Sequence, residues 1–152
     1  MTDHLLRVES LVKQFPIRGG ALNRVVNYIQ AVNGVSFTVR RGEVLGLVGE
    51  SGSGKTTIGR LVLRLEEATA GKVIFDGTNI LELPKKEMRR FRKRMQIIFQ
   101  DPYGSMNPRM TVQAALSEPM ALHGIGNSRR DRIDRAASLL EEVGLLSEHL
   151  GR

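Results

Sequence analysis

Apolar and polar residues alternate in several short stretches near the start of the chain. Residues 6–13 alternate imperfectly, which predicts a half-buried strand that ends near Phe15 and Pro16. Residues 18–20 contain two glycines and predict a loop, and residues 25–32 predict a second strand.

An Asn-Gly pair, which is a strong signal for a hairpin turn, occupies residues 33 and 34 and precedes a cleanly alternating stretch at 35–39. We therefore expect the chain to turn back at this pair and to add a third strand to a small antiparallel sheet. Another hairpin is expected over residues 71–80, with Asp76 and Gly77 as its turn.

Two continuous apolar runs, residues 44–48 and 95–99, are typical of strands that are buried on both faces in a parallel sheet. We expect these two strands to lie side by side. Apolar residues recur at helical spacing from Ile58 to Leu65, which predicts a helix over residues 55–66 with one apolar face.

The pattern changes in the last third of the chain, where no further strand is expected. Residues 101–108 predict a loop, and helical patterns follow over 111–122 and 129–143. Ser128 is placed to cap the second of these helices and Gly144 to end it. The residues expected on the inner face of that helix are Ile133, Ala136, Ala137, Leu140 and Val143.

Composition changes this picture little. The chain has 152 residues, of which 41% are hydrophobic and 26% are charged, as in ordinary globular domains. It has no cysteine, which excludes disulfides and thiolate metal sites and suits a cytoplasmic setting. Its first residues do not resemble a secretion signal and no run approaches about 18 apolar residues, so we expect neither export nor a membrane-spanning helix.

The formal net charge of +7 comes mainly from one stretch. Residues 85–94 hold seven basic residues against Glu87, which gives about +6, and Pro84 is placed to open a short helix there. This helix can be a solvated face, or a surface for acidic lipid headgroups or an acidic partner loop. Nucleic acid is the least favoured partner, because Phe91 alone interrupts the run and no base-stacking aromatic set accompanies it.

The strongest functional signal is at residues 49–57, where GESGSGKTT fits the phosphate-binding pattern of a glycine, four residues and Gly-Lys-Ser/Thr. The expected strand before it and helix after it are the context that this loop needs, since N–H groups at a helix start are unpaired. The residues of this candidate site are Gly49, Glu50, Ser51, Gly52, Ser53, Gly54, Lys55, Thr56 and Thr57.

The chemistry of this loop follows from its residue types. Backbone N–H groups from about residue 52 to residue 57 are expected to form a nest around phosphates, because glycines permit positive φ angles and a close approach. Lys55 can reach the terminal phosphates as a point charge, and the Thr56 hydroxyl can ligate a magnesium ion that bridges them.

Three stretches of the chain together resemble the ATP-binding subunits of ABC transporters, and within them the bacterial oligopeptide and dipeptide importers. These stretches are AVNGVSF at residues 31–37 leading to Gly42-Glu43, the glycine loop at 49–57, and IFQDPYGSMNPRM at 98–110. The last is the most specific, because glycine loops occur in many nucleotide-binding families. The resemblance covers nearly the whole chain.

The resemblance implies an α/β fold, the P-loop nucleotide-binding domain of ABC type, incomplete, with an antiparallel β subdomain and the start of a helical subdomain. It implies a nucleotide-binding core over residues 1–100, and a Q-loop with the beginning of the helical subdomain over residues 101–152. The cofactors that it implies are ATP and Mg²⁺.

The resemblance also implies residue roles. Gln100 matches the family glutamine that contacts the magnesium ion and the attacking water. The catalytic residues would then be Lys55 and Gln100, and the metal ligands Thr56 and Gln100. Phe15 best matches the aromatic residue that stacks on adenine, with Tyr28 as the alternative.

The implied function is to couple ATP binding and hydrolysis to the uptake of peptides, with nickel, glutathione or sugar-like cargo as alternatives within the same branch. The implied partners are membrane-spanning permease subunits, contacted through the Q-loop region, and a second ATP-binding subunit, identical or related. Nucleic acid is not among them. The implied location is peripheral, on the cytoplasmic face of the bacterial inner membrane.

Several parts of the family pattern do not occur in these residues: a Ser-Gly-Gly-Gln signature, an apolar strand that ends in Asp-Glu, and a histidine on a later strand. Asp76 and the pair Glu141-Glu142 imitate the acidic strand end, but we expect the first in a hairpin turn and the pair on a solvated helix face. The histidines, each expected at the surface, are His4, His123 and His149.

These departures predict the N-terminal part of a longer subunit that is marginally stable alone, binds ATP weakly and has negligible turnover. Two other interpretations stay open. One is another phosphoryl-transfer enzyme with the same loop, although a GTPase needs an Asn-Lys-x-Asp string that is absent and no kinase lid is identified. The other is a non-catalytic module that binds nucleotide or a partner.

Overall fold

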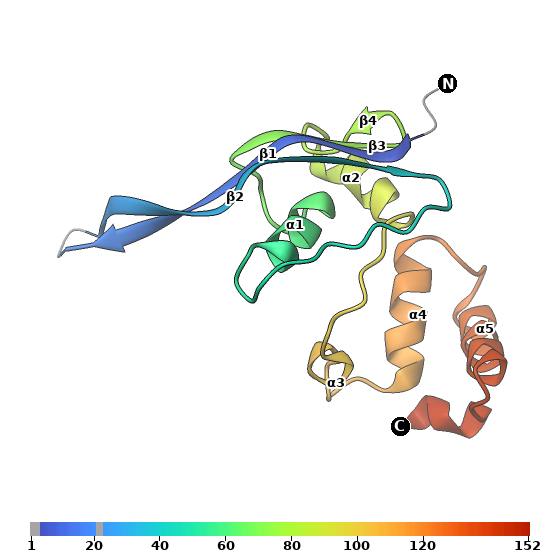
Figure 1. Ribbon diagram of the computed structural model, residues 1–152. Helices are drawn as coiled ribbons and strands as arrows, with labels where there is room; N and C mark the ends of the chain where they lie inside the picture. Colours follow the sequence, from blue (N-terminus) through green and yellow to red (C-terminus); the bar gives the residue numbers. More distant parts are fainter. Residues whose placement is uncertain (1–3, 21–22) are drawn as a thin grey trace. The chain divides into compact units, whose positions relative to one another are not determined.

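The computed structural model describes residues 4–20 and 23–152 (Figure 1). It divides into two units, of which the first ends at Gln96 and the second begins at Ile97. The first unit holds a four-stranded antiparallel sheet with two helices, and the second is helical. None of the described helices is long and apolar enough to cross a membrane.

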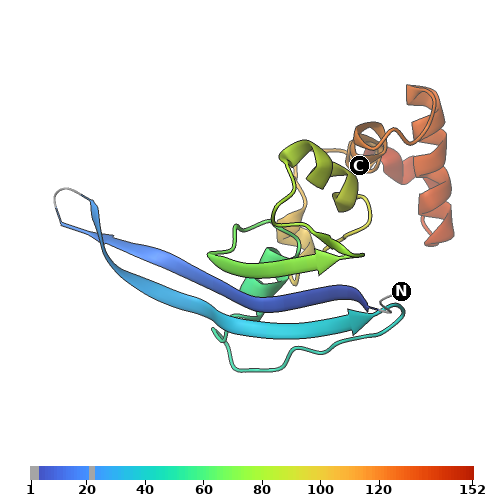
Figure 2. The same ribbon diagram turned by 90° about the horizontal axis from the view of Figure 1, so that it is seen from above.

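The sheet has the strand order β2-β1-β3-β4, with antiparallel pairing throughout (Figure 2). Its strands are β1 (His4–Gly19), β2 (Arg24–Arg40), β3 (Ala70–Phe75) and β4 (Thr78–Asn79). Because β3 pairs only with the first part of β1, the rest of β1 pairs with β2 alone. These two strands therefore run on as a two-stranded ribbon beyond the sheet (Figures 1 and 2).

The ribbon corrects two predictions. The loop expected at residues 18–20 begins later than predicted, because β1 continues to Gly19 and only Gly20 is part of the turn, its carbonyl accepting from the Asn23 N–H at 3.1 Å. The hairpin expected at Asn33-Gly34 is wrong, because β2 runs through this pair. The two residues lie opposite a single residue of β1 and form a bulge, and Gly34 supplies the positive φ of 68°.

A second bulge, in β1, decides which side chains reach the core. The register with β2 shifts between Val8 and Leu11, and the register with β3 shifts between Glu9 and Val12. Ser10, which lies in both intervals, has a φ of 45°. Val8 and Leu11 are three positions apart and would face opposite sides of a regular strand. Because of the bulge, both are buried in the same core cluster.

The hairpin predicted at residues 71–80 is confirmed. Phe75 pairs with Thr78, so Asp76 and Gly77 form a two-residue turn. Both have positive φ angles, 49° and 80°, as the type of turn that matches strand twist requires.

Two helices cover one face of the sheet. Helix α1 (Lys55–Val62) follows the glycine loop, and α2 (Lys85–Arg92) begins after Pro84, as predicted. Helix α1 is shorter than the expected 55–66, because the chain leaves the helix at Leu63 and Arg64 has a φ of 49°. The buried core residues of this layer are Val8, Leu11, Val32, Ile58, Leu61, Val73, Phe75, Ile80 and Met88.

The two apolar runs expected as parallel strands are not strands. Residues 44–48 and 95–99 have no regular secondary structure, and Val44 and Ile98 are each 94% exposed. A strand exists only where a neighbour accepts and donates its hydrogen bonds, and neither run has a ladder partner among the described residues. Apolar content alone was the basis of these predictions, and it does not supply a partner.

The second unit has the two long helices that the pattern predicts. Ser128 caps the second as expected, because its side-chain oxygen accepts from the Asp131 N–H. Thr111, expected as the first residue of the other helix, is instead its N-cap and accepts from the Ala114 N–H. Val143 is exposed rather than inward, because the second long helix ends one residue earlier, at Glu142. The helices of this unit are α3 (Pro102–Ser105), α4 (Val112–Leu122), α5 (Arg129–Glu142) and the 3₁₀ turn η1 (Ser147–Gly151).

Candidate phosphate-binding site

The glycine loop ends where α1 begins. Within the loop the Ser53 N–H donates to the Glu50 carbonyl at 3.2 Å, which closes a tight turn. Gly54 is the N-cap of α1, and its carbonyl accepts the first helical hydrogen bond, from the Ile58 N–H at 2.9 Å. The predicted loop-to-helix junction is therefore present, whereas the segment before the loop is irregular.

Gly54 occupies a position that no other residue fits. Its φ of 90° is in the left-handed region, and a Cβ built on it would lie 2.4 Å from the carbonyl oxygen of Ala31. Ala31 is the extra residue of another irregularity in β2, because Lys13 pairs with Val32 while the next residue of β1 pairs with Gln30. The sheet and the loop thus meet backbone to backbone at this point.

A row of backbone donors is left free at this junction. Among the described residues, the N–H groups of residues 52, 54, 55, 56 and 57 donate to no acceptor in a turn, a cap or a ladder. The last three belong to the first turn of α1, where a helix has no internal acceptors. Free N–H groups at the positive end of a helix dipole attract anions.

Lys55 folds back over the loop. Its ammonium donates to the carbonyl oxygens of Gly49 and Glu50 at 2.7 and 2.6 Å, and to the Ser53 hydroxyl at 3.2 Å. All three of its protons therefore point at the loop that a bound phosphate would enter. Thr56, beside it in the first turn of α1, is exposed.

Phe15 lies on the same side of the sheet as α1. It follows Lys13 by two residues along β1, and the Lys13 ammonium lies 4.6 Å from the centre of the Phe15 ring. Lys13 is 8% exposed and reaches the segment after α1, where it donates to Glu66 Oε1 at 2.8 Å and to the Glu67 carbonyl at 2.7 Å.

Tyr28, the alternative aromatic residue, lies on the opposite face of the ribbon. Phe15 pairs directly with Ile29, and Tyr28 pairs with Pro16. Directly paired residues share a face and neighbouring residues along a strand do not, so the two aromatic rings are separated by the ribbon. Phe15 is 36% exposed and Tyr28 is 54% exposed.

Gln100 belongs to the second unit, where it is exposed in an irregular segment after the run at 95–99. Gln100 and Lys55 therefore lie in different units. No group of three or more acidic or histidine residues that could hold a metal ion occurs in the described parts of the chain.

The acidic residues set aside as imitations of a catalytic carboxylate are engaged elsewhere or solvated. Asp76 forms ion pairs with Arg94, at 2.6 Å, and with Arg41. The hydrogen bond from Arg94 is the main cause that lowers the pKa of the Asp76 carboxyl below its usual value, and the charges of both arginines add to it. Glu141 and Glu142 are exposed on α5, as expected.

The histidine predictions hold only in part. His4 lies in β1 and is half-buried, with its Nδ1 buried without a hydrogen-bond partner among the described residues, so its expected surface position is met only in part. His123 follows α4 and is half-buried. His149 lies in η1, where its Nδ1 accepts from the Leu146 N–H at 3.1 Å.

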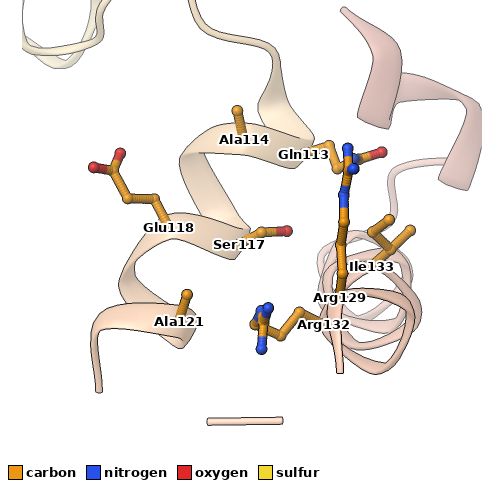
Figure 3. A pocket seen from close by; sticks show the side chains of 8 residues that line it. All are labelled: Gln113, Ala114, Ser117, Glu118, Ala121, Arg129, Arg132 and Ile133. Carbon is orange, nitrogen blue, oxygen red and sulfur yellow. The ribbon is translucent and has the colours of Figure 1, made fainter. Parts of the chain in front are cut away.

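A groove of about 330 Å³ lies within the second unit, between α4 and α5 (Figure 3). Ser117 and Ala121 face it from α4, and Arg129 and Arg132 face it from α5. None of the residues predicted for the phosphate site lines this groove.

Sequence reasoning missed Ala31 and Lys13. The sequence around Ala31 does not indicate that the Ala31 carbonyl lies against Gly54, because that contact depends on a bulge in β2. For Lys13 a signal was present, since a lysine two residues before an aromatic residue shares its face of a strand.

A model of the ABC transporter family matches residues 32–152. The probable peptide ABC transporter ATP-binding protein y4tS of Sinorhizobium fredii (strain NBRC 101917 / NGR234) is 47% identical over 152 residues, which are 100% of this chain and 43% of that protein. The glutathione import ATP-binding protein GsiA of Escherichia coli K12 is 49% identical over 150 residues, which are 99% of this chain and 24% of that protein.

Among solved structures, a dimeric post-hydrolysis state of the ATP-binding cassette MJ0796 bound to ADP and Pi aligns with a TM-score of 0.76. The alignment covers 97% of this chain and 60% of that chain at 24% identity, so the likeness concerns the fold alone. It confirms the predicted fold class. The chain spans less than half the length of the two curated relatives.

Proposed function

This chain belongs to the ABC transporter family, and on that premise we propose that residues 49–57 bind the phosphates of ATP. The family predicted from the glycine loop and from residues 98–110 is thereby confirmed. The observation that carries the proposal is the row of free N–H groups at residues 52 and 54–57, beside the Lys55 ammonium.

The acceptors that now hold Lys55 support this function. They are two neutral carbonyls and a hydroxyl. Phosphate oxygens carry formal charge and form stronger, charge-assisted hydrogen bonds, so an entering triphosphate would draw the ammonium toward itself. The free N–H groups at the start of α1 would then donate hydrogen bonds to the same phosphates.

The magnesium ion of the nucleotide would take the Thr56 hydroxyl as a ligand, because hydroxyl and phosphate oxygens suit this hard cation. When bound, the ion bridges phosphate oxygens and neutralises charge that develops on them. We propose Gln100 as its second protein ligand, since an amide oxygen ligates weakly and can release. Lys55 and Gln100 are the residues that we propose for a direct part in hydrolysis by the whole protein.

Phe15 is the residue that we propose for adenine. It stands on the α1 face of the ribbon, on the side where the sheet meets the glycine loop at Gly54. Tyr28 stands on the other face. Base stacking on an aromatic ring contributes about 1 to 3 kcal/mol and needs no particular base, so a phenylalanine suffices.

For the whole protein we propose an importer subunit that couples ATP binding and hydrolysis to the uptake of peptides or of glutathione. The relatives named above, a probable peptide transporter protein and a glutathione import protein, support this class of cargo. The proposed partners are permease subunits, reached through the region after Gln100, and a second ATP-binding subunit. The proposed location is peripheral, on the cytoplasmic face of the inner membrane.

The test is a titration of the chain with ATP and with GTP, each with and without Mg²⁺. We expect saturable binding of both nucleotides that Mg²⁺ strengthens, because the loop contacts phosphates and the ring stacks on any base. Lys55→Ala should weaken ATP binding roughly 10- to 100-fold, the loss expected for charged hydrogen bonds.

Lys72→Ala is the matched control, since Lys72 is an exposed lysine of β3 outside the loop. It should leave ATP affinity unchanged. Equal affinity of the chain and its Lys55→Ala variant, with both folded by circular dichroism, contradicts the proposal.

A further inference from the structure

Helix α2 presents a one-sided basic surface. Six residues form it, and we call them the basic face: Lys85, Lys86, Arg89, Arg90, Arg92 and Lys93. At 100° per residue they span an arc of about 160° around the helix axis. Met88 and Phe91 lie roughly opposite this arc and pack on the core of the first unit. All six basic residues are exposed.

Five of the six charges have no partner in the described parts of the chain. Arg92 donates to the Arg64 carbonyl at 3.2 Å, and the other five make neither an ion pair nor a side-chain hydrogen bond. Arg94, at the end of the run, forms an ion pair with Asp76. A cluster of like charges repels itself, so its concentration on one face disfavours the folded state unless an anion covers it.

We propose that the basic face of α2 docks on a bilayer surface rich in anionic lipid headgroups. Clusters of four to eight lysines and arginines on one helix have this use, because each contributes attraction to the negative surface. The attraction reaches over a Debye length of about 10 Å at 0.1 M salt, which is close to the width of a helix. All six side chains therefore act together without a fitted pocket.

The helix does not insert into the bilayer. Met88 is 3% exposed, and the Phe91 ring packs edge-on against Phe75 with their centres 6.2 Å apart. The basic face has no apolar side chain to bury among lipid chains. Docking is therefore electrostatic and must disappear at high salt, unlike that of an amphipathic anchor helix.

The same geometry disfavours two other anionic partners. Single-stranded nucleic acid needs exposed aromatic rings for its bases, and the aromatic residue of this helix faces the core. An acidic peptide needs close, directed ion pairs along one line, whereas these charges fan out over a convex helix of eight residues. A location beside a membrane favours lipid further, and that point alone rests on the proposed function.

The experiment is sedimentation of the chain with vesicles of phosphatidylcholine, with and without phosphatidylglycerol. We expect binding to the vesicles that contain phosphatidylglycerol at about 0.1 M salt, and its loss near 1 M, where the Debye length is about 3 Å. The double variant Arg89→Gln/Arg90→Gln should lower the partition coefficient roughly 25-fold, from about fivefold for each charge.

Arg129→Gln/Arg130→Gln is the matched control. It removes two adjacent, exposed arginines from the first turn of another helix, and it lowers the formal net charge by the same two units. We expect it to change the partition coefficient less than about twofold, because a local face rather than net charge does the binding.

Three results would overturn the inference: no preference for phosphatidylglycerol, an equal loss in both double variants, or tighter binding to an RNA oligonucleotide or to polyglutamate with loss in Arg89→Gln/Arg90→Gln. An ATP titration of the same samples separates this inference from the proposed function. Chain that binds ATP but no vesicles refutes the lipid surface alone, and chain that binds vesicles but no ATP refutes the proposed site alone.

Discussion

At the scale of single residues, Gly54 carries two constraints at once, its positive φ and the Ala31 carbonyl that fills the space of a Cβ. One atom added there must move either the loop or β2. The phosphate-binding N–H groups and the bulged part of β2 are thus held in one arrangement.

Replacement of Gly54 by alanine is therefore expected to lower both stability and ATP affinity, the latter by tenfold or more, because about 1 to 3 kcal/mol of strain enters the loop. Gly59→Ala is the control. Gly59 lies inside α1, where an added Cβ would have nothing within 4 Å, so alanine should stabilise the helix by about 0.5 to 1 kcal/mol. Thermal unfolding and ATP titration of both variants measure these effects, and wild-type affinity in Gly54→Ala would contradict the constraint.

The two aromatic residues of the ribbon provide a second prediction. Phe15→Ala should weaken ATP binding roughly 5- to 150-fold, the equivalent of the stacking energy, whereas Tyr28→Ala should leave it unchanged because Tyr28 is on the other face. Isothermal titration with ATP distinguishes them. The reverse ranking would assign adenine to Tyr28 and refute the assignment made from strand register.

Asp76 provides a prediction on pH. Its pKa is lowered in the folded chain, chiefly by the Arg94 hydrogen bond, so its carboxylate stabilises the fold above its unfolded pKa near 4. That contribution is lost as pH falls through the lower, folded pKa. Urea unfolding between pH 7 and pH 3 measures the effect. The free energies of unfolding of the parent chain and of the Asp76→Asn variant should differ at neutral pH and converge in acid.

Asp134→Asn is the control for this pH series, because Asp134 is exposed on α5 and makes no ion pair among the described residues. Its stability should follow that of the parent chain at every pH. A difference between parent and Asp76→Asn that is constant down to pH 3 would mean that the charge of Asp76 does not matter.

At the scale of elements, the N-terminus of α5 is capped by one side chain, that of Ser128. Ser128→Ala removes the acceptor of the Asp131 N–H and should destabilise the second unit by about 1 kcal/mol. Ser138 is the control in the same helix, since its hydroxyl only back-bonds to the Asp134 carbonyl, and Ser138→Ala should be neutral or slightly stabilising. Helicity at 222 nm during urea unfolding measures both, and equal losses would remove the capping role.

Elements whose signals are local could be predicted from the sequence. The Ser128 cap and the turn at Asp76-Gly77 depend on neighbours within four residues, and both are found as expected. The glycine loop and the start of α1 belong to the same class, because the motif itself contains the residues that shape it.

Strands could be predicted only in part, because a strand depends on a partner far along the chain. An Asn-Gly pair often forms a hairpin turn, but at residues 33 and 34 it forms a bulge in β2, because a long β1 is available to pair on both sides of it. The bulge at Ser10 likewise depends on two neighbouring strands. Ala31 joined the site through such a pairing, so no local pattern placed it there.

At the scale of the whole molecule, the two units differ in how much apolar surface they bury. The first has a core cluster of nine buried residues shared by its sheet and both of its helices. In the second, the buried hydrophobic residues among those described are Met120, Ala136 and Leu140. Local opening costs least where few apolar contacts are lost.

We therefore expect the amides of α4 and α5 to exchange with deuterium roughly tenfold faster, or more, than those of β1 between Leu6 and Val12. Hydrogen exchange followed by mass spectrometry of peptides from each unit measures the ratio. Equal protection in both units would show that they unfold as one cooperative body.

The irregular register of β2 has a last consequence, for self-association. β2 is an outer strand, and outer strands offer unpaired N–H and C=O groups on which another chain can be templated into fibrils. The extra residues at Ala31 and at Asn33-Gly34 break the even spacing of those groups midway along the strand. An incoming strand can form regular hydrogen bonds with one half of β2 but is out of register with the other half. This limits the length of any intermolecular ladder.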